Sequence, residues 1–104
     1  MQKVYLSKST RREKKWMVEI ENPSTGRTKT VHFGASGMSD FTIHKDDERY
    51  KRYITRHRSR ENWTKSGIDS AGFWSRWILW NKPSLIESIK DAEKRFNLKI
   101  IKRK

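Results

Sequence analysis

Cysteine is absent from this sequence, which excludes disulfide bonds and metal sites built from thiolates. No apolar run approaches the roughly 18 residues that a membrane-spanning helix requires, and residues 1–5 do not begin an apolar secretory leader. We therefore expect a protein that is neither secreted by that route nor embedded in a membrane, and that is compatible with a reducing compartment.

Aliphatic residues are few as well. All apolar residues together make up only 33% of the chain, but five Trp, four Phe and three Tyr are among them. Each aromatic side chain buries a large area, so a few of them can supply a core, whereas disordered basic tails are poor in aromatic residues. The length of 104 residues suits one compact domain. The sequence therefore predicts a single basic domain over residues 1–104.

Acidic residues are scarce relative to basic ones: 12 Asp and Glu stand against 25 Lys and Arg, which gives a formal net charge of +13. On a small protein this excess produces a field that attracts polyanions and repels other copies of the chain. A charge that serves solubility alone is commonly about 2 to 8 on a small domain. The charge therefore favours a polyanion-binding protein, with nucleic acid as the first candidate partner.

The first third of the chain has the period-two alternation of strands that bury one face. The apolar members of the first two stretches are Val4, Leu6, Trp16, Val18 and Ile20. A turn-forming segment, residues 22–26, leads into a third stretch at residues 27–33. We expect a meander of three antiparallel strands.

The rest of the chain predicts about three helices and one further strand. Residues 46–60 begin with acidic side chains and carry an apolar stripe of helical period, formed by Tyr50, Tyr53, Ile54 and His57. Residues 71–80 are apolar almost all round and should be buried. Ser84 and Glu87 form a capping box for a helix that runs to about Phe96, and residues 98–101 are β-branched and apolar. The predicted fold class is α+β: a small antiparallel sheet, made of the N-terminal meander plus a short C-terminal strand, packed with about three helices.

The strongest indication of function is a row of arginines on the first of these helices. Members three or four residues apart would form a cationic edge about 16 Å long, at roughly 1.5 Å per residue. A solvated helix face usually mixes charges, but residues 49–60 contain no acidic residue. The candidate nucleic-acid-binding residues are Arg49, Arg52, Arg56, Arg58, Arg60, Lys51, Lys14 and Lys15.

The tryptophans and glycines have functional and structural interpretations. Trp side chains can stack on nucleobases, but this chain needs most of them for its core, which leaves Trp63 or Trp80 for interface work. The two glycines in residues 34–37 could cradle a phosphate, but they also suit the end of a strand.

No catalytic motif accompanies the arginine row. The three histidines share no metal-binding spacing, and Walker, nucleophile-elbow and Rossmann patterns are absent. We therefore expect no enzyme, no catalytic residue, no metal ligand and no cofactor. One alternative stays open, because acidic residues between Asp40 and Glu48 could serve a metal-dependent nuclease, although helix N-termini attract acidic residues anyway.

Several segments resemble a known family. They are residues 33–37, 40–46, 53–58 and 72–83, of which the last contains the run Gly-Phe-Trp-Ser-Arg-Trp. Together they resemble small basic proteins without established activity that are encoded by nucleocytoplasmic large DNA viruses, giant viruses among them. The resemblance covers roughly residues 33–90. It implies a viral setting, with a location in the virion or in the cytoplasm or nucleus of the host cell, and a role in packaging or coating DNA.

Two functions of different classes follow. The first is sequence-tolerant nucleic-acid binding, with DNA preferred over RNA only through the family resemblance. The second is a structural virion protein that binds an acidic protein partner, since Trp- and Arg-rich surfaces also suit protein interfaces. The metal-dependent nuclease is a third. The sequence does not define an oligomeric state.

Overall fold

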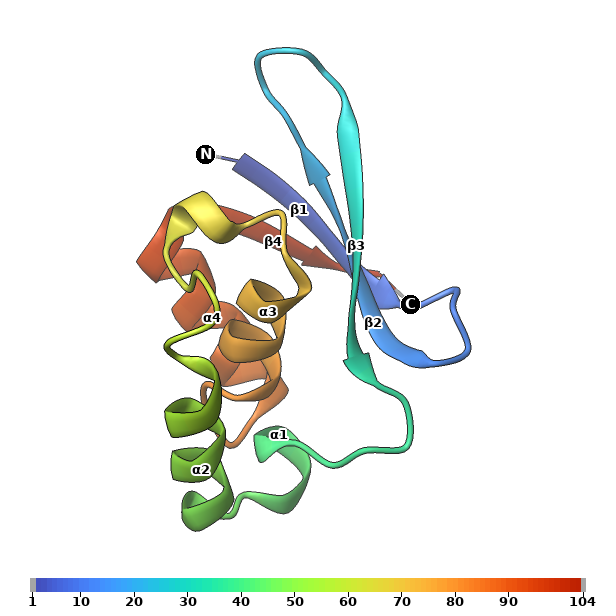
Figure 1. The fold of residues 1–104 in the computed structure, drawn as a ribbon. Coiled ribbons are helices and arrows are strands. Elements are labelled where there is room, and N and C mark those ends of the chain that lie inside the picture. Colours follow the sequence, from blue (N-terminus) through green and yellow to red (C-terminus); the bar gives the residue numbers. More distant parts are fainter. Residues whose placement is uncertain (1, 104) are drawn as a thin grey trace.

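The computed structural model describes residues 2–103, which form a four-stranded sheet with the helices gathered on one of its faces (Figure 1). The strands are β1 (Gln2–Lys8), β2 (Lys14–Glu21), β3 (Thr28–Ala35) and β4 (Leu98–Lys102). Their order in the sheet is β3-β2-β1-β4, so the C-terminal strand joins the sheet beside the N-terminal one. The α+β fold class predicted from the sequence is confirmed.

The pairing of the strands explains the alternation in the sequence. β1 and β2 pair antiparallel with Leu6 opposite Val18, and β2 and β3 pair antiparallel with Val18 opposite Val31. These three side chains are buried on the face that the helices cover. The predicted meander is therefore present, with the predicted apolar residues facing the core.

The fourth strand differs in one respect from the predicted antiparallel sheet. β4 pairs with β1 in parallel, with Val4 opposite Ile100, so the sheet is mixed. A parallel pair needs a long crossover connection. β2, β3 and all the helices lie between β1 and β4 in the chain and together make up that connection.

The helical half contains α1 (Phe41–His44), α2 (Asp47–His57), a 3-10 turn η1 (Lys65–Gly67), α3 (Ala71–Trp74), a π-helical turn η2 (Ser75–Leu79) and α4 (Leu85–Phe96). The N-cap side chains of α1, α2, α3 and α4 each accept a backbone N–H bond, as is usual for Asp and Ser at this position. α4 has the predicted bounds, with Ser84 as its N-cap and Asn97 in the left-handed conformation at its end.

Residues 71–80 form two short elements where the sequence predicts one helix. α3 continues into η2, and the N–H of Trp80 donates to the carbonyl of Ser75, five residues earlier. Trp74 and Trp77 are buried here, and their indole N–H groups donate to the carbonyls of Ile68 and Trp63. The predicted burial of this segment is confirmed, and most of the tryptophan residues belong to the core.

The elements that end early or were not predicted lie around α2. The helix stops at His57, not at Arg60, because the chain turns there and brings Trp63 against the core. α1 and η1 lie in segments where no helix was expected. Between residues 2 and 103, no helix has the length and apolar character needed to cross a membrane.

Candidate functional site

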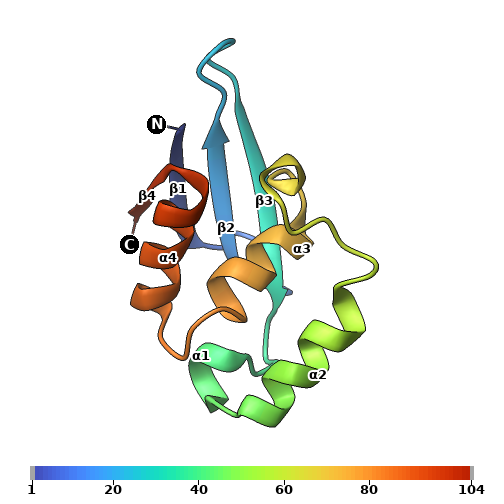
Figure 2. The ribbon, with the colours of Figure 1, turned by 90° about the vertical axis from the view of Figure 1, so that its left-hand side faces the viewer.

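Only one side of α2 packs against the rest of the protein. Its predicted apolar stripe, formed by Tyr50, Tyr53, Ile54 and His57, is half-buried, and no residue of the helix is fully buried. The carboxylate of Asp46 caps the N-terminus of the helix, where it accepts hydrogen bonds from the N–H groups of Glu48 (2.9 Å) and Arg49 (3.4 Å). The remaining surface of α2 therefore faces solvent (Figure 2).

Three of the predicted arginines lie together on this exposed surface, and we call Arg49, Arg52 and Arg56 the arginine face. The row spans about 10 Å at roughly 1.5 Å per residue. Arg49 has a long ion pair with Asp46 (3.9 Å), and neither Arg52 nor Arg56 forms an ion pair within residues 2–103. Their charge is therefore available to a partner.

The nearest acid after the row does not neutralise it. Glu61 accepts a hydrogen bond from the indole of Trp63 (3.2 Å) and lies 3.4 Å from Nδ1 of His57. The carboxylate is thus turned toward the protein side of α2. The exposed side of α2 therefore carries Lys51, Arg52 and Arg56, with Glu48 beside them at the N-terminal end of the helix.

The other predicted basic residues lie in different places. Arg58 is the C-cap of α2 and Arg60 lies in the turn that follows, so both are exposed but neither continues the row. Lys51 is exposed on α2, where it lines a shallow depression together with Arg52 and Arg56. The continuous edge predicted over residues 49–60 is therefore shorter, with two flanking arginines beyond its end.

Lys15 is engaged within the protein. Its ammonium group lies 2.6 Å from a carboxylate oxygen of Asp40, and the two side chains are 15% and 3% exposed. Asp40 also accepts the N–H of Thr42 (2.9 Å) as the N-cap of α1. The pair joins β2 to the start of the helical half, so the ammonium group of Lys15 is paired within the protein.

Lys14 lies beside the arginine face, across a groove. The groove has a volume of about 440 Å³ and separates the ends of β2 and β3 from α2 and η2. Lys14 and Arg56 both line it, together with the carboxylates of Asp40 and Glu61. The structure therefore brings these two predicted residues to one depression, although 42 positions separate them in the sequence.

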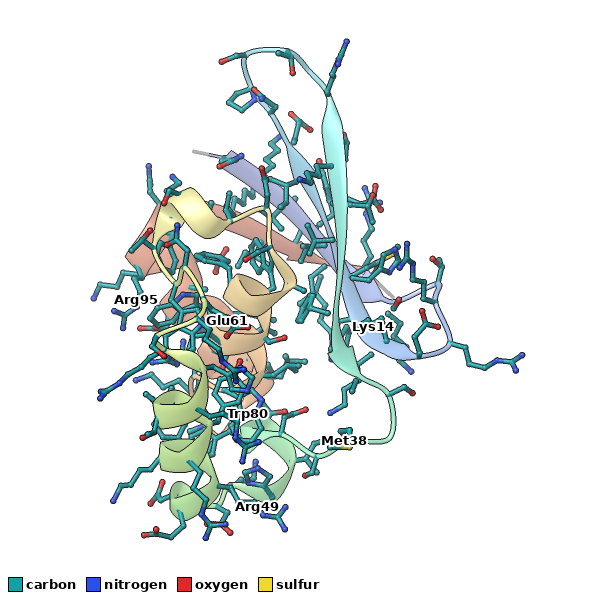
Figure 3. The ribbon with its side chains drawn as sticks, in the orientation of Figure 1. Lys14, Met38, Arg49, Glu61, Trp80 and Arg95 are labelled. Carbon is teal, nitrogen blue, oxygen red and sulfur yellow. The ribbon has the colours of Figure 1, made fainter. Side chains whose placement is uncertain are left out.

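A second pocket, of about 250 Å³, opens directly against the arginine face. We call it the Trp80 pocket. It is lined by Met38, Ser39, His44, Arg49, Arg52, Tyr53, Arg56 and Trp80. Figure 3 shows Met38, Arg49 and Trp80 in the same lower part of the molecule, around α1 and α2. All three members of the arginine face therefore border one aromatic depression.

The aromatic rings at this pocket are packed on one another. The rings of Tyr53 and Trp80 lie parallel, 4.4 Å apart with an interplanar angle of 1°. His44 lies 5.2 Å from Trp80, and its Nδ1 accepts the N–H of Asp46 (2.9 Å). Burial raises the pKa of Tyr53 above its usual range, so the phenol stays neutral.

Arg76 contacts the tryptophan residues near this pocket and was not predicted as a functional residue. Its guanidinium lies 4.3 Å from the ring centre of Trp77 and 5.4 Å from that of Trp63, and Nη1 donates to the carbonyl of Trp80 (2.7 Å). Burial lowers the pKa of Arg76. Its sequence signature is a single cation inside an apolar run.

The acidic and glycine motifs have structural explanations. Asp40 and Asp46 cap α1 and α2, and no group of three His, Asp or Glu side chains placed to hold a metal occurs within residues 2–103. Gly34 has a φ of 78°, and a Cβ atom there would lie 2.8 Å from Leu79. Close packing against η2 explains this glycine without a bound phosphate.

The fold and the site together define a small α+β protein with an exposed arginine face beside an aromatic pocket. Residues 4–57 match the family described as a family of unknown function (DUF5754), and the chain belongs to this family. The matched residues include most of β1 and all of β2, β3, α1 and α2, and hence the arginine face. No curated protein and no solved structure matches the chain.

Proposed function

We propose that this protein binds nucleic acid with little sequence preference, through the arginine face of α2. The observation that supports this most directly is the exposure of Arg49, Arg52 and Arg56 on one side of a helix, with Arg52 and Arg56 free of ion pairs within the described residues. Lys51, Arg58 and Arg60 extend the positive surface, and Lys14 adds to it across the groove. Lys15 has no part in it because Asp40 binds its ammonium group.

The mechanism is the replacement of counterions. Cationic side chains that neutralise phosphates release the ions condensed on the nucleic acid, which drives binding and makes it depend on salt. A formal charge of +13 also draws the polyanion toward the protein before contact. Neither step requires a catalytic group, so the proposal is a binding protein and not an enzyme.

We also propose a viral setting for this binding. The resemblance of residues 33–90 to small basic proteins of large DNA viruses supports a role in packaging or coating a viral genome, in the virion or in the cytoplasm or nucleus of the host cell. DNA is the preferred partner on the same ground, with RNA as the second. Other virion proteins are further partners in this setting.

An acidic protein partner is the alternative function. The exposed side chain of Met38, 65% accessible, lies at the rim of the arginine-lined pocket, and methionine and arginine are both enriched at protein interfaces. A structural virion protein that docks on an acidic surface would use the same residues. The two functions differ in whether a phosphate backbone alone suffices for binding.

Binding of the wild-type protein to random-sequence DNA and RNA across a range of salt concentrations tests the proposed function. We expect binding at low salt with a log–log slope that corresponds to about five or more neutralised phosphates. Similar affinities for unrelated sequences would support weak sequence preference. An absence of binding at low salt would rule the proposal out and leave the acidic protein partner.

A further inference from the structure

We propose that the Trp80 pocket takes one unpaired nucleobase, so that the protein prefers single-stranded to double-stranded nucleic acid. This inference rests on the proposed function and adds a ligand class to it. The pocket is lined by the arginine face and by Tyr53 and Trp80, whose rings are stacked on one another and which we call its aromatic floor. It therefore offers cations for a backbone and an aromatic surface for a ring within one depression.

The dimensions of the pocket suit a single base. Its volume of about 250 Å³ is slightly below the range of about 300–1,000 Å³ that drug-sized ligands occupy. A planar base fits such a space, whereas a duplex does not enter it. In a duplex the bases are stacked and paired, so only an unpaired or extruded base can reach a protein pocket.

The floor of the pocket is held in place before any ligand binds. The ring of Trp80 packs against Tyr53 on α2 and against His44 on α1, and the carbonyl of Trp80 accepts a hydrogen bond from Arg76. A surface that is already ordered loses little conformational entropy on binding. Sequence-tolerant proteins for single strands use such aromatic surfaces, because every base has a π-face.

The rim of the pocket adds an apolar cover. Met38 is 65% exposed although it is a large apolar side chain, and it lines the pocket with Trp80. A base on the aromatic floor would bury this side chain. Its adaptable thioether chain suits bases of different shapes.

Charge complementarity favours a nucleotide over an acidic protein segment as the occupant. Arg49, Arg52 and Arg56 border the pocket from α2, so phosphates on either side of an inserted base would lie along a row of guanidinium groups. An Asp- or Glu-rich peptide supplies the anions but no ring for the floor. Its binding would not depend on Trp80.

The test compares a single-stranded oligonucleotide of mixed sequence, its duplex, and a single strand of equal charge whose central nucleotides are abasic. We expect the wild-type protein to bind the intact single strand about tenfold more tightly than the other two at the same salt concentration. Trp80→Leu should remove that preference, so that the three ligands bind with similar affinity. Trp80→Phe, which keeps a ring, should retain most of it.

A second measurement covers the case in which Trp80→Leu does not fold. Wild-type protein is titrated with adenosine monophosphate and with ribose 5-phosphate, and the Trp80 and His44 resonances are followed by NMR. Shifts with the nucleotide and none with the sugar phosphate at equal concentration are expected. Equal shifts with both would overturn the inference.

The two proposals fail in different ways. Equal affinity for single strand, duplex and abasic strand, unchanged by Trp80→Leu, would overturn the nucleobase pocket and leave general nucleic-acid binding in place. Binding to none of the three would overturn the proposed function as well. Binding of poly-glutamate that weakens with Trp80→Leu as much as single-strand binding does would identify an acidic peptide as the occupant and overturn the nucleobase assignment.

Discussion

The ring of Tyr53 lies parallel to the indole ring of Trp80, 4.4 Å away and with an interplanar angle of 1°. This contact joins α2, which has no fully buried residue, to the segment that ends the π-helical turn η2. It also forms the floor of the Trp80 pocket. This aromatic pair is therefore one of the contacts that position the arginine face relative to the rest of the protein.

The first prediction concerns this pair. Tyr53→Leu removes the stacked ring, and an aromatic pair contributes about 0.5–1.5 kcal/mol beyond the area it buries. We expect α2 to open more often, which native-state hydrogen exchange would show as faster exchange of the amides in residues 50–57. Tyr53→Phe keeps the ring and is the matched control. Equal exchange in both variants would mean that α2 is held by other contacts.

The second prediction concerns the ion pair between Lys15 and Asp40. Lys15→Ala leaves a carboxylate that is 3% exposed without its cation, and loss of one partner from a buried pair costs about 3–5 kcal/mol. Chemical denaturation should show that the free energy of unfolding decreases by an amount near the lower end of this range, because the Lys15 side chain is 15% exposed. A double variant with Lys15→Met and Asp40→Asn should recover part of it.

The same variant tests whether Lys15 binds the ligand. Under conditions where Lys15→Ala remains folded, its affinity for nucleic acid and its salt slope should match those of the wild type. A reduced slope would show that Lys15 leaves Asp40 to contact phosphate.

The third prediction concerns Gly34 and Gly37, which both have positive φ angles, of 78° and 83°. A Cβ atom at Gly34 would lie 2.8 Å from Leu79, whereas at Gly37 it would meet nothing within 4 Å. Backbone strain costs each alanine variant about 1–2 kcal/mol, and Gly34→Ala also forces the buried side chain of Leu79 to shift. The midpoint of thermal unfolding should therefore be well below that of Gly37→Ala in the Gly34→Ala variant. Equal midpoints would contradict the close contact.

The fourth prediction concerns pH. Burial alone would raise the pKa of Asp91, but hydrogen bonds from Asn81 and Arg95 outweigh it, and the pKa lies below its usual value. A carboxyl whose pKa is lower in the folded state stabilises the protein above its unfolded pKa of about 3.9, and this contribution is lost as pH falls through the folded pKa. Unfolding free energy should thus fall less steeply below about pH 4 in Asp91→Asn than in the wild type.

The control for this measurement is Asp47→Asn, at an exposed position on α2. It should retain the steep acid dependence of the wild type. A wild-type slope in Asp91→Asn would show that the interactions of Asp91 do not contribute to acid stability.

The parts of the fold that the sequence predicted well depend on local patterns. The alternation of apolar and polar residues predicted the three N-terminal strands, because a strand with one buried face has a period of two. Ser84 and Glu87 marked the start of α4 as a capping box, and the helix ends at Phe96 as expected. The burial of residues 71–79 followed from their apolar character.

The parts that could not be predicted depend on tertiary contacts. α2 ends at His57 because Trp63 must reach the core, and no turn signal in residues 58–60 shows this. The π-helical turn η2, the engagement of Lys15 by Asp40, and the meeting of Arg49 with Trp80 at one pocket all require the folded chain. The arginine row was predicted from its spacing, but the pocket beside it was not.

The central claim, that the arginine face binds nucleic acid, is tested most directly by two triple variants with the same charge loss. One replaces Arg49, Arg52 and Arg56 with alanine. The other replaces Lys90, Lys94 and Lys99, which are exposed on α4 and β4 away from α2 (Figure 2). The measurement is the salt dependence of binding to a single-stranded oligonucleotide.

We predict that the arginine variant loses about 2 from the log–log salt slope, at about 0.7 per phosphate contact for a single strand, and binds far more weakly. The lysine variant should keep a slope close to that of the wild type. Equal losses in both variants would contradict the account, because binding would then follow net charge and not the arginine face of α2.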